Sequence, residues 1–245
     1  MREYLNRSRE QWALIRRADG AANTGLAIFI HGFRGNYLST WGSIPDLLNN
    51  RADFDPDLAP WDFLFLGYAT RDVNCYLDIA ALIDGAWRRA ADGEPPHRAK
   101  YTRLALFGHS LGTLGIRQAL CAASSDKPLV DALHSVTLFG TPLNGSPLAI
   151  FGSMLYAIGD ALKPTNPQLR MLKVWTECSL ANRPWPKVRI VLGQGDWVVG
   201  QQLHELIVWP GDLQADVTTL DHTDLVKPDA WANCSVMDYL RSGLR

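Results

Sequence analysis

Short apolar runs alternate with longer stretches whose apolar residues recur every three or four positions. The apolar runs begin near residues 26, 62, 103, 135 and 187, and their β-branched and aromatic residues are typical of strands buried on both faces. Between them, the spacing predicts helices over 37–50, 75–91 and 113–123. Strands that alternate with helices predict an α/β fold with a mostly parallel, doubly wound sheet.

The two ends of the chain extend this pattern. Residues 1–20 leave two interpretations open, because Tyr4, Leu5 and Trp12 could line a helix face while 11–16 would equally suit an edge strand. At the other end, residues 212–220 predict a last strand, and a terminal helix is expected from about 229 to 240.

About forty residues separate the run at 135 from the run at 187, which is too many for a simple connection. We interpret 143–186 as a helical cap inserted after the sixth strand of a single domain, 1–245. Its apolar residues would line an acyl pocket, and its second helix is expected over 168–181. The alternative is an extra pair of core helices.

The composition narrows the class of protein. The formal net charge of −1, from 24 basic and 25 acidic residues, gives no reason to expect a nucleic-acid partner. No run reaches the roughly 18 apolar residues of a membrane span, and the N-terminus does not resemble a secretory signal, so we expect a cytoplasmic protein without a transmembrane segment. The cysteines are too far apart to predict a metal site or a disulfide framework: Cys75, Cys121, Cys178 and Cys234.

The chemistry centres on Gly108-His-Ser-Leu-Gly112, which lies between a predicted strand and a predicted helix. This is the G-x-S-x-G pattern of a nucleophile elbow in its required context. Glycines at both ends leave room for the tight turn, so Ser110 is expected at the carboxyl edge of the sheet as a nucleophile.

A second signal follows the first buried strand, where the chain reads His31-Gly-Phe33. Gly32 allows a sharp turn that can direct the N–H of Phe33 into the site. With the N–H of Leu111 it would supply the two donors of an oxyanion hole. We expect His31 to lie beside the substrate and to hold the loop by hydrogen bonds rather than to transfer protons.

Other side chains are expected at the same edge, since carboxyl ends of parallel strands meet there. Thr70, Thr141 and Leu143 are candidates for contact with substrate. Thr70 has a second interpretation, because it could instead cap the helix that begins near Asn74.

A base and an acid follow the serine in the order Ser110, Asp196, His222, which is the chain order of α/β-hydrolase triads. Asp196 ends a predicted strand, and Asp224 is expected to brace the histidine loop instead. The remaining histidines fit the role of base less well. His97 is expected on a solvated face, His134 at the opposite edge of the sheet and His204 within a helix.

Five motifs fall in one order: Ile30–Asn36, Gly108–Thr113, Thr141–Ser146, Gly195–Val199 and the pair His222 and Lys227-Pro228. Together they resemble the lipase-like serine esterases of the α/β-hydrolase superfamily. The branch that they most resemble contains the GPI inositol-deacylases and related bacterial and mitochondrial serine esterases. This resemblance implies hydrolysis of a carboxylic ester without a cofactor or a metal.

The sequence thus predicts a serine hydrolase that acts on a small-molecule or lipid ester through an acyl-enzyme on Ser110. A thioesterase or an acyltransferase would use the same triad, because only the acceptor or the leaving group differs. A non-catalytic binding protein on the same scaffold is the alternative from another class.

Overall fold

A computed structural model describes residues 2–8, 11–17, 24–122, 128–146, 156–180, 187–199 and 213–245. Its centre is one eight-stranded sheet in the order β1-β2-β4-β3-β5-β6-β7-β8. The strands are β1 (Glu3–Arg7), β2 (Trp12–Arg16), β3 (Gly25–Ile30), β4 (Trp61–Leu66), β5 (Arg103–His109), β6 (Leu133–Phe139), β7 (Lys187–Gly193) and β8 (Leu213–Thr218). From β4 to β8 every neighbouring pair is parallel, and β2 joins β4 in the antiparallel sense. The mostly parallel α/β sheet predicted from the apolar runs is confirmed.

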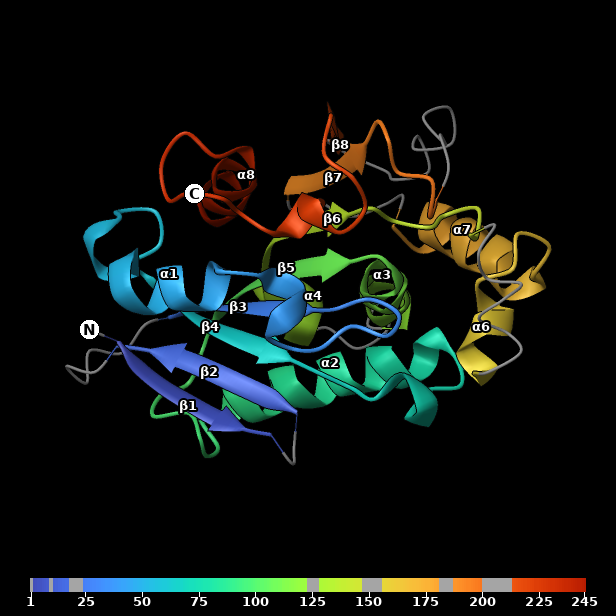
Figure 1. The fold of residues 1–245 in the computed structure, drawn as a ribbon. Helices are drawn as coiled ribbons and strands as arrows, with labels where there is room; N and C mark the ends of the chain where they lie inside the picture. The colour runs from blue at the N-terminus through green and yellow to red at the C-terminus, as the bar shows by residue number, and fades with distance from the viewer. Residues whose placement is uncertain are drawn as a thin grey trace.

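Helices cover both faces of this sheet (Figure 1). One face carries α2 (Tyr76–Asp92), α3 (Leu111–Ala122) and α7 (Pro167–Leu180), and the other carries α1 (Ile44–Arg51) and α8 (Ser235–Leu244). The shorter helices are α4 (Pro128–Ala132) and α6 (Ala157–Ala161), with single 3-10 turns η1 (Ser39–Trp41), η2 (Ala52–Phe54), η3 (Thr70–Asp72) and η5 (Asp224–Val226).

Alternating side chains of each central strand enter the two cores. Ile28 packs with α2 and α3, whereas Phe29 faces α1 and α8. The Phe29 ring stacks between Phe65 and Phe107 of the flanking strands, with ring centroids 4.6 and 4.8 Å apart. Both sides of β3 are therefore buried, which explains why its sequence is an unbroken apolar run.

The first residues form an antiparallel hairpin at one edge of the sheet. β1 pairs with β2, and β2 continues onto β4. Residues 12–16 form a strand, so the helix interpretation is wrong, but β2 lies between β1 and β4 and the strand at the edge is β1. β2 has a strand on each side, so its apolar side chains pack on the two faces of the sheet and not along one face of a helix.

The region between β6 and β7 contains α6 and α7. Thr176 of α7 is buried, and its Oγ1 accepts a hydrogen bond of 3.3 Å from Arg117 Nε of α3. This helix therefore packs in the layer beside α3. The cap over 143–186 as a unit stays a prediction, because 147–155 and 181–186 lie outside the described residues.

Two helices begin later than the pattern predicts. α1 starts at Ile44 because η1 and Gly42, with a φ of 55°, interrupt the preceding stretch. α8 starts at Ser235, six residues after the expected position, and runs on to Leu244.

Candidate active site

The elbow forms where β5 passes directly into α3. Ser110 has a φ of 52°, which a residue with a side chain rarely adopts. Gly112 makes the turn possible, since a Cβ there would lie 2.4 Å from the carbonyl oxygen of Ile30 and 2.6 Å from that of His31. The turn is thus pressed against the end of β3, and the glycine at this position is a steric requirement.

Hydrogen bonds to β6 and α3 hold the strained turn. The Ser110 N–H donates to the Phe139 carbonyl oxygen at 2.9 Å, and the Ser110 carbonyl accepts from the Thr113 hydroxyl at 2.6 Å. The Thr113 oxygen also lies 2.8 Å from the Thr141 hydroxyl. Thr141 is buried in this network, so its contacts support the elbow.

The base and the acid meet at the same edge. His222 Nδ1 lies 2.7 Å from Asp196 Oδ2, and both side chains are at least nine-tenths buried. Asp196 Oδ1 accepts the N–H groups of Val198 and Val199 at 3.0 and 3.1 Å. These bonds fix the carboxylate, so its second oxygen faces the imidazole and holds the proton on Nδ1.

The turn that carries His222 is braced by its own residues. Asp221 Oδ1 accepts the N–H groups of Thr223 and Asp224 at 2.8 and 2.9 Å. Donation from the Asp224 and Thr223 amides and the Thr223 hydroxyl lowers the pKa of Asp221. Asp221 therefore supplies the bracing that the sequence suggested for Asp224.

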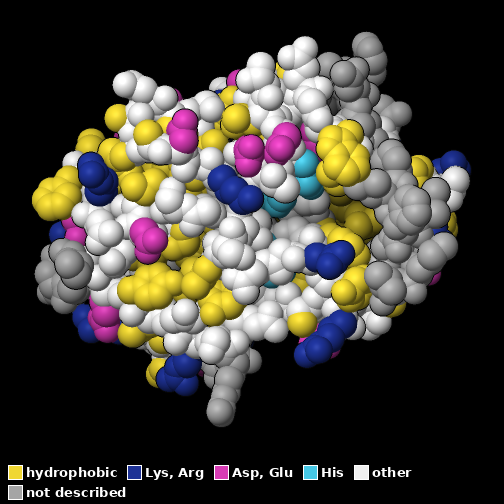
Figure 2. Space-filling model, in the orientation of Figure 1, with side chains coloured by type: hydrophobic (Ala, Val, Ile, Leu, Met, Phe, Trp, Pro, Cys, Tyr) yellow, Lys and Arg dark blue, Asp and Glu magenta, His cyan; other side chains and the backbone are white. Residues whose placement is uncertain are grey.

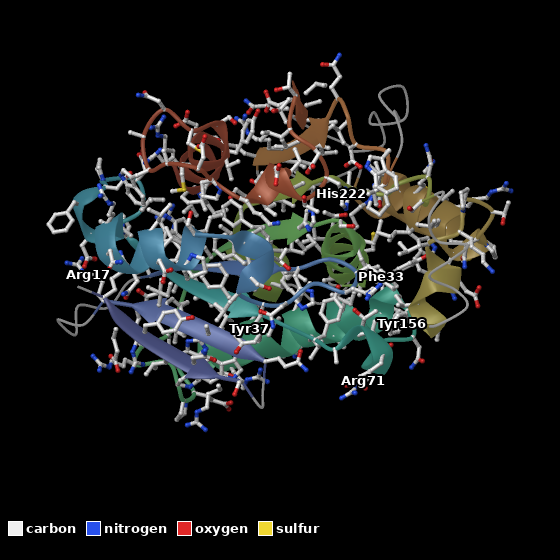
Figure 3. The ribbon with its side chains drawn as sticks, in the orientation of Figure 1. Arg17, Phe33, Tyr37, Arg71, Tyr156 and His222 are labelled. Carbon is white, nitrogen blue, oxygen red and sulfur yellow. The ribbon has the colours of Figure 1, made fainter. Side chains whose placement is uncertain are left out.

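Ser110 and His222 line one cavity of about 280 Å³ together with Gly32, Phe33 and His109. The loop after β3 and the loop around His222 form opposite walls. Figure 3 shows His222 above Phe33 across this site, and Figure 2 shows histidine side chains inside a central hollow.

The strand register brings the two expected oxyanion donors together. Ile30 pairs with Gly108 where β3 and β5 end side by side. A Cβ on Gly32 would lie 2.6 Å from Ser110 Cβ, so the His31-Gly-Phe33 turn contacts the nucleophile directly. Phe33 follows this close approach, and Leu111 begins α3, where the first N–H groups lack helical partners.

His31 is fully buried and bonds to the backbone through both ring nitrogens. Its Nδ1 donates to the Gly32 carbonyl at 2.9 Å, and its Nε2 accepts the Tyr68 N–H at 3.1 Å. Burial lowers the pKa of His31, which favours this neutral form. The ring joins the ends of β3 and β4, as expected for a residue that holds the loop.

Thr70 does not cap the helix that begins near Asn74, and its contact with substrate stays a prediction. Its hydroxyl oxygen accepts the Arg34 N–H at 2.8 Å, which fixes the loop after β3. The helix near Asn74 is capped instead by Asp78, whose carboxylate accepts the N–H groups of Asn74 and Cys75. Thr70 is mostly buried behind that loop.

An apolar wall lies on one side of the site. The Phe33 ring meets Tyr156 edge to face, with centroids 5.4 Å apart. Leu143 is buried in the same cluster as Ile158 and Leu162. Figure 3 shows Phe33 and Tyr156 side by side next to α6. Neither Tyr156 nor α6 gave a specific signal in the sequence, because their contact with Phe33 spans more than a hundred residues.

Among the residues that the structure describes, no group of three or more His, Cys, Asp or Glu side chains could hold a metal ion. Within the same ranges, no helix has the length and apolar character needed to cross a bilayer. His204 lies outside the described residues.

The fold is similar to those of solved lipase and esterase structures. A lipase from Bacillus licheniformis, BlEst2 in its propeptide form, matches 89% of this chain and 50% of its own at 16% identity, with a TM-score of 0.65. Esterase B from Lactobacillus rhamnosis, inhibited by a tributyrin phosphonate, matches 99% of this chain and 84% of its own at 16% identity, with a TM-score of 0.64.

The fold is that of the α/β-hydrolases. Phospholipase PlaB from Legionella pneumophila is a further neighbour with 21% identity, a TM-score of 0.56 and 71% of this chain covered. The matched region spans 40% of that phospholipase, less than half its length. No protein-family model matches the sequence, and no curated protein does.

Proposed function

We propose that this protein is a serine hydrolase that cleaves a carboxylic ester. The observation that carries the proposal is the 2.7 Å contact between His222 Nδ1 and Asp196 Oδ2, in the cavity that Ser110 also lines. An imidazole oriented by a carboxylate, in a cavity shared with a serine on a strained turn, is the arrangement that activates a hydroxyl nucleophile.

In the proposed reaction, Ser110 Oγ bonds to the ester carbonyl carbon while His222 Nε2 takes the hydroxyl proton. The amides of Phe33 and Leu111 would donate to the resulting oxyanion. The imidazolium then protonates the leaving alcohol as the carbon–oxygen bond breaks. Water attacks the acyl-enzyme and gives a proton to His222, which passes it to Ser110 Oγ as the acyl–oxygen bond breaks and the acid is released.

The acyl part of the substrate is proposed to lie against the apolar wall. Phe33 and Tyr156 form this wall in the described residues, with Leu143 and Ile158 buried behind it. An aliphatic or lipid acyl chain suits such a surface. The resemblance of the motifs to the GPI inositol-deacylase branch also favours a lipid ester, and the solved lipases and esterases share the fold.

Labelling by a fluorophosphonate probe tests the nucleophile. We expect the wild-type protein to be labelled and to hydrolyse p-nitrophenyl butanoate, and Ser110→Ala to lose both properties while it retains its circular dichroism spectrum. Ser242→Ala, which removes a hydroxyl from α8, is the matched control and should still be labelled. Labelling that persists in Ser110→Ala would overturn the assignment.

A series of p-nitrophenyl esters with acyl chains from two to twelve carbons tests the apolar wall. We expect kcat/KM to rise with chain length up to the size of the cavity and then to fall. Tyr156→Ala should lower kcat/KM for the long esters more than for the acetate, because it removes the ring packed on Phe33.

A further inference from the structure

The lining of the cavity carries positive charge. Arg34 and Lys227 both line the cavity that contains Ser110 and His222, and they come from loops about 190 residues apart in sequence. In Figure 2, basic side chains lie on both sides of the hollow where histidine is visible.

Arg34 occupies a costly backbone position. Its φ is 55°, in the left-handed region that glycine or asparagine adopts at lower cost. The Thr70 hydroxyl fixes its N–H at 2.8 Å. A strained non-glycine residue at the edge of a reactive cavity points to a use for its side chain.

Lys227 is held by packing of its stem. A Cβ on Gly42 would come within 3.1 Å of Lys227 Cγ and 3.2 Å of its Cβ, so the stem lies over that glycine. The Ser43 hydroxyl donates to the Pro228 carbonyl at 3.0 Å and ties the same loop to the turn before α1. The position of Lys227 at the cavity is therefore set by the fold.

No carboxylate offsets these charges in the lining of the cavity, as far as the described residues define it. Asp221 is near in sequence, but its Oδ1 is occupied by donors of its own turn. Asp196 is bonded to His222 and to two backbone amides. Lys227 lies near enough to Asp221 to contribute to the lowered pKa of that carboxyl, but no carboxylate lines the cavity itself, so two cations there favour an anionic ligand group.

The position of Lys227 also indicates which half of the substrate bears that group. His222 hands its proton to the leaving alcohol in the proposed reaction, and Lys227 lies five residues further along the same loop. The acyl half is proposed on the other side, against Phe33 and Tyr156. Lys227 therefore lies on the side of the alcohol half, and Arg34 lines the same cavity from the loop after β3.

We propose that Arg34 and Lys227 select esters whose alcohol portion carries an anion, a carboxylate or a phosphate. This inference rests on the proposed serine hydrolase function and names its substrate class. Arg34 offers a planar fork of donors and Lys227 a point charge, and both bind either anion. The experiment distinguishes a preference for a carboxylate from a preference for a phosphate.

The experiment compares butanoyl esters of four phenols that differ only in the para substituent. The substituents are a neutral carboxamide, a carboxylate, a phosphate monoester and a cationic trimethylammonium group. Each variant is compared with the wild-type protein on the same ester, so that differences in leaving-group reactivity cancel. The readout is the kcat/KM for each charged ester divided by that for the neutral ester.

We expect this ratio to favour the anionic esters in the wild-type protein. It should fall about threefold in Arg34→Gln and in Lys227→Gln, and about tenfold in the double variant. Arg34→Glu should raise the ratio for the trimethylammonium ester. Raising the salt from about 0.05 to 0.5 M should weaken the wild-type preference, because the wall is open to solvent.

Arg51→Gln is the matched control, since it removes one positive charge at the far end of α1, outside the cavity lining. Its ratios should equal those of the wild-type protein. Ratios that stay within twofold of wild type in the double variant would overturn the proposal. A drop confined to the phosphate ester or to the carboxylate ester identifies the anion.

Fluorophosphonate labelling separates this test from the test of the catalytic function. If the wild-type protein is neither labelled nor active on the neutral ester, the serine hydrolase proposal fails. If it is labelled and active but shows no preference among the charged esters, only the role of Arg34 and Lys227 fails.

Discussion

His109 Nε2 lies 2.8 Å from the carbonyl oxygen of His222, which ties the nucleophile elbow to the turn that carries the base. A carbonyl oxygen only accepts, so Nε2 carries the proton of the neutral ring. Burial, followed by the nearby His222 ring, lowers the pKa of His109 to about 3. The ring therefore stays neutral at physiological pH and fixes the position of His222 relative to Ser110.

His109 is accordingly expected to act as a positioning residue. Replacing it by Leu should lower kcat by about ten- to a hundredfold, with little change in KM, because the base loses its anchor. His109→Gln retains a side-chain N–H donor and should recover part of this loss. Steady-state kinetics on p-nitrophenyl butanoate across pH 6–9 provide the measurement. Equal losses in the Leu and Gln variants would indicate a packing role alone.

Asp196→Asn should reduce kcat by about four orders of magnitude, since an amide can impose the wrong tautomer on His222. The fold should persist, because the change is nearly isosteric. Asp224→Asn is the control, as Asp224 makes no contact with the imidazole in the described structure. The acid would need reassignment if the control lost activity and Asp196→Asn did not.

Gly112→Ala should destabilise the protein by about 1–3 kcal/mol or prevent folding. The added Cβ would overlap backbone oxygens at 2.4 and 2.6 Å, and neither strand end can easily move. Gly85→Ala in α2 is the matched control, because its nearest contact is an arginine tip at 3.6 Å. The control should gain about 0.5–1 kcal/mol from helix propensity. Urea denaturation measures both changes, and equal stability of the two variants would contradict the steric argument.

His97 shows where a local pattern misled the sequence interpretation. It lies among charged residues and was expected on a solvated face, but its exposed fraction is 8% and its ring meets Tyr101 edge to face at 5.3 Å. Tyr101 follows in the same segment, whereas Arg16 comes from β2, and the local pattern of charged residues encodes neither neighbour.

Burial, with Arg89 and Arg16 nearby, lowers the pKa of His97 from 6.5 to about 4. The unfolded chain thus binds a proton more readily, so this contribution to stability is complete above pH 6.5 and is lost as the pH falls towards 4. His97→Gln should flatten the dependence of the unfolding free energy in that window by up to about 1.4 kcal/mol per pH unit. Urea denaturation at pH 4.5, 5.5 and 7.5 measures it. Parallel pH curves for variant and wild type would contradict a buried neutral His97.

The central strands and the chemistry of the elbow were predictable because they depend on neighbours in sequence. The apolar run Leu26–Ile30 indicates a buried strand. The glycines of Gly108-His-Ser-Leu-Gly112 indicate a tight turn with Ser110 in a strained conformation. The start of α1 and the pairing of 11–16 depended on contacts across the fold. Arg34 was not predicted as a ligand-binding residue, because no sequence pattern reports its φ angle or the hydrogen bond that its N–H donates to Thr70.

The basic residues that line the cavity and the aromatic ring that packs on Phe33 come from separate parts of the chain. Arg34 and Lys227 belong to loops tied to the sheet and to α1, whereas Tyr156 precedes α6 in the segment between β6 and β7. Under the proposed function, selectivity for the acyl chain would diverge by exchange of that one segment, while the residues proposed to recognise the alcohol would stay unchanged. A chimera that replaces residues 147–186 offers a direct route to esterases with new chain-length preferences and the same headgroup.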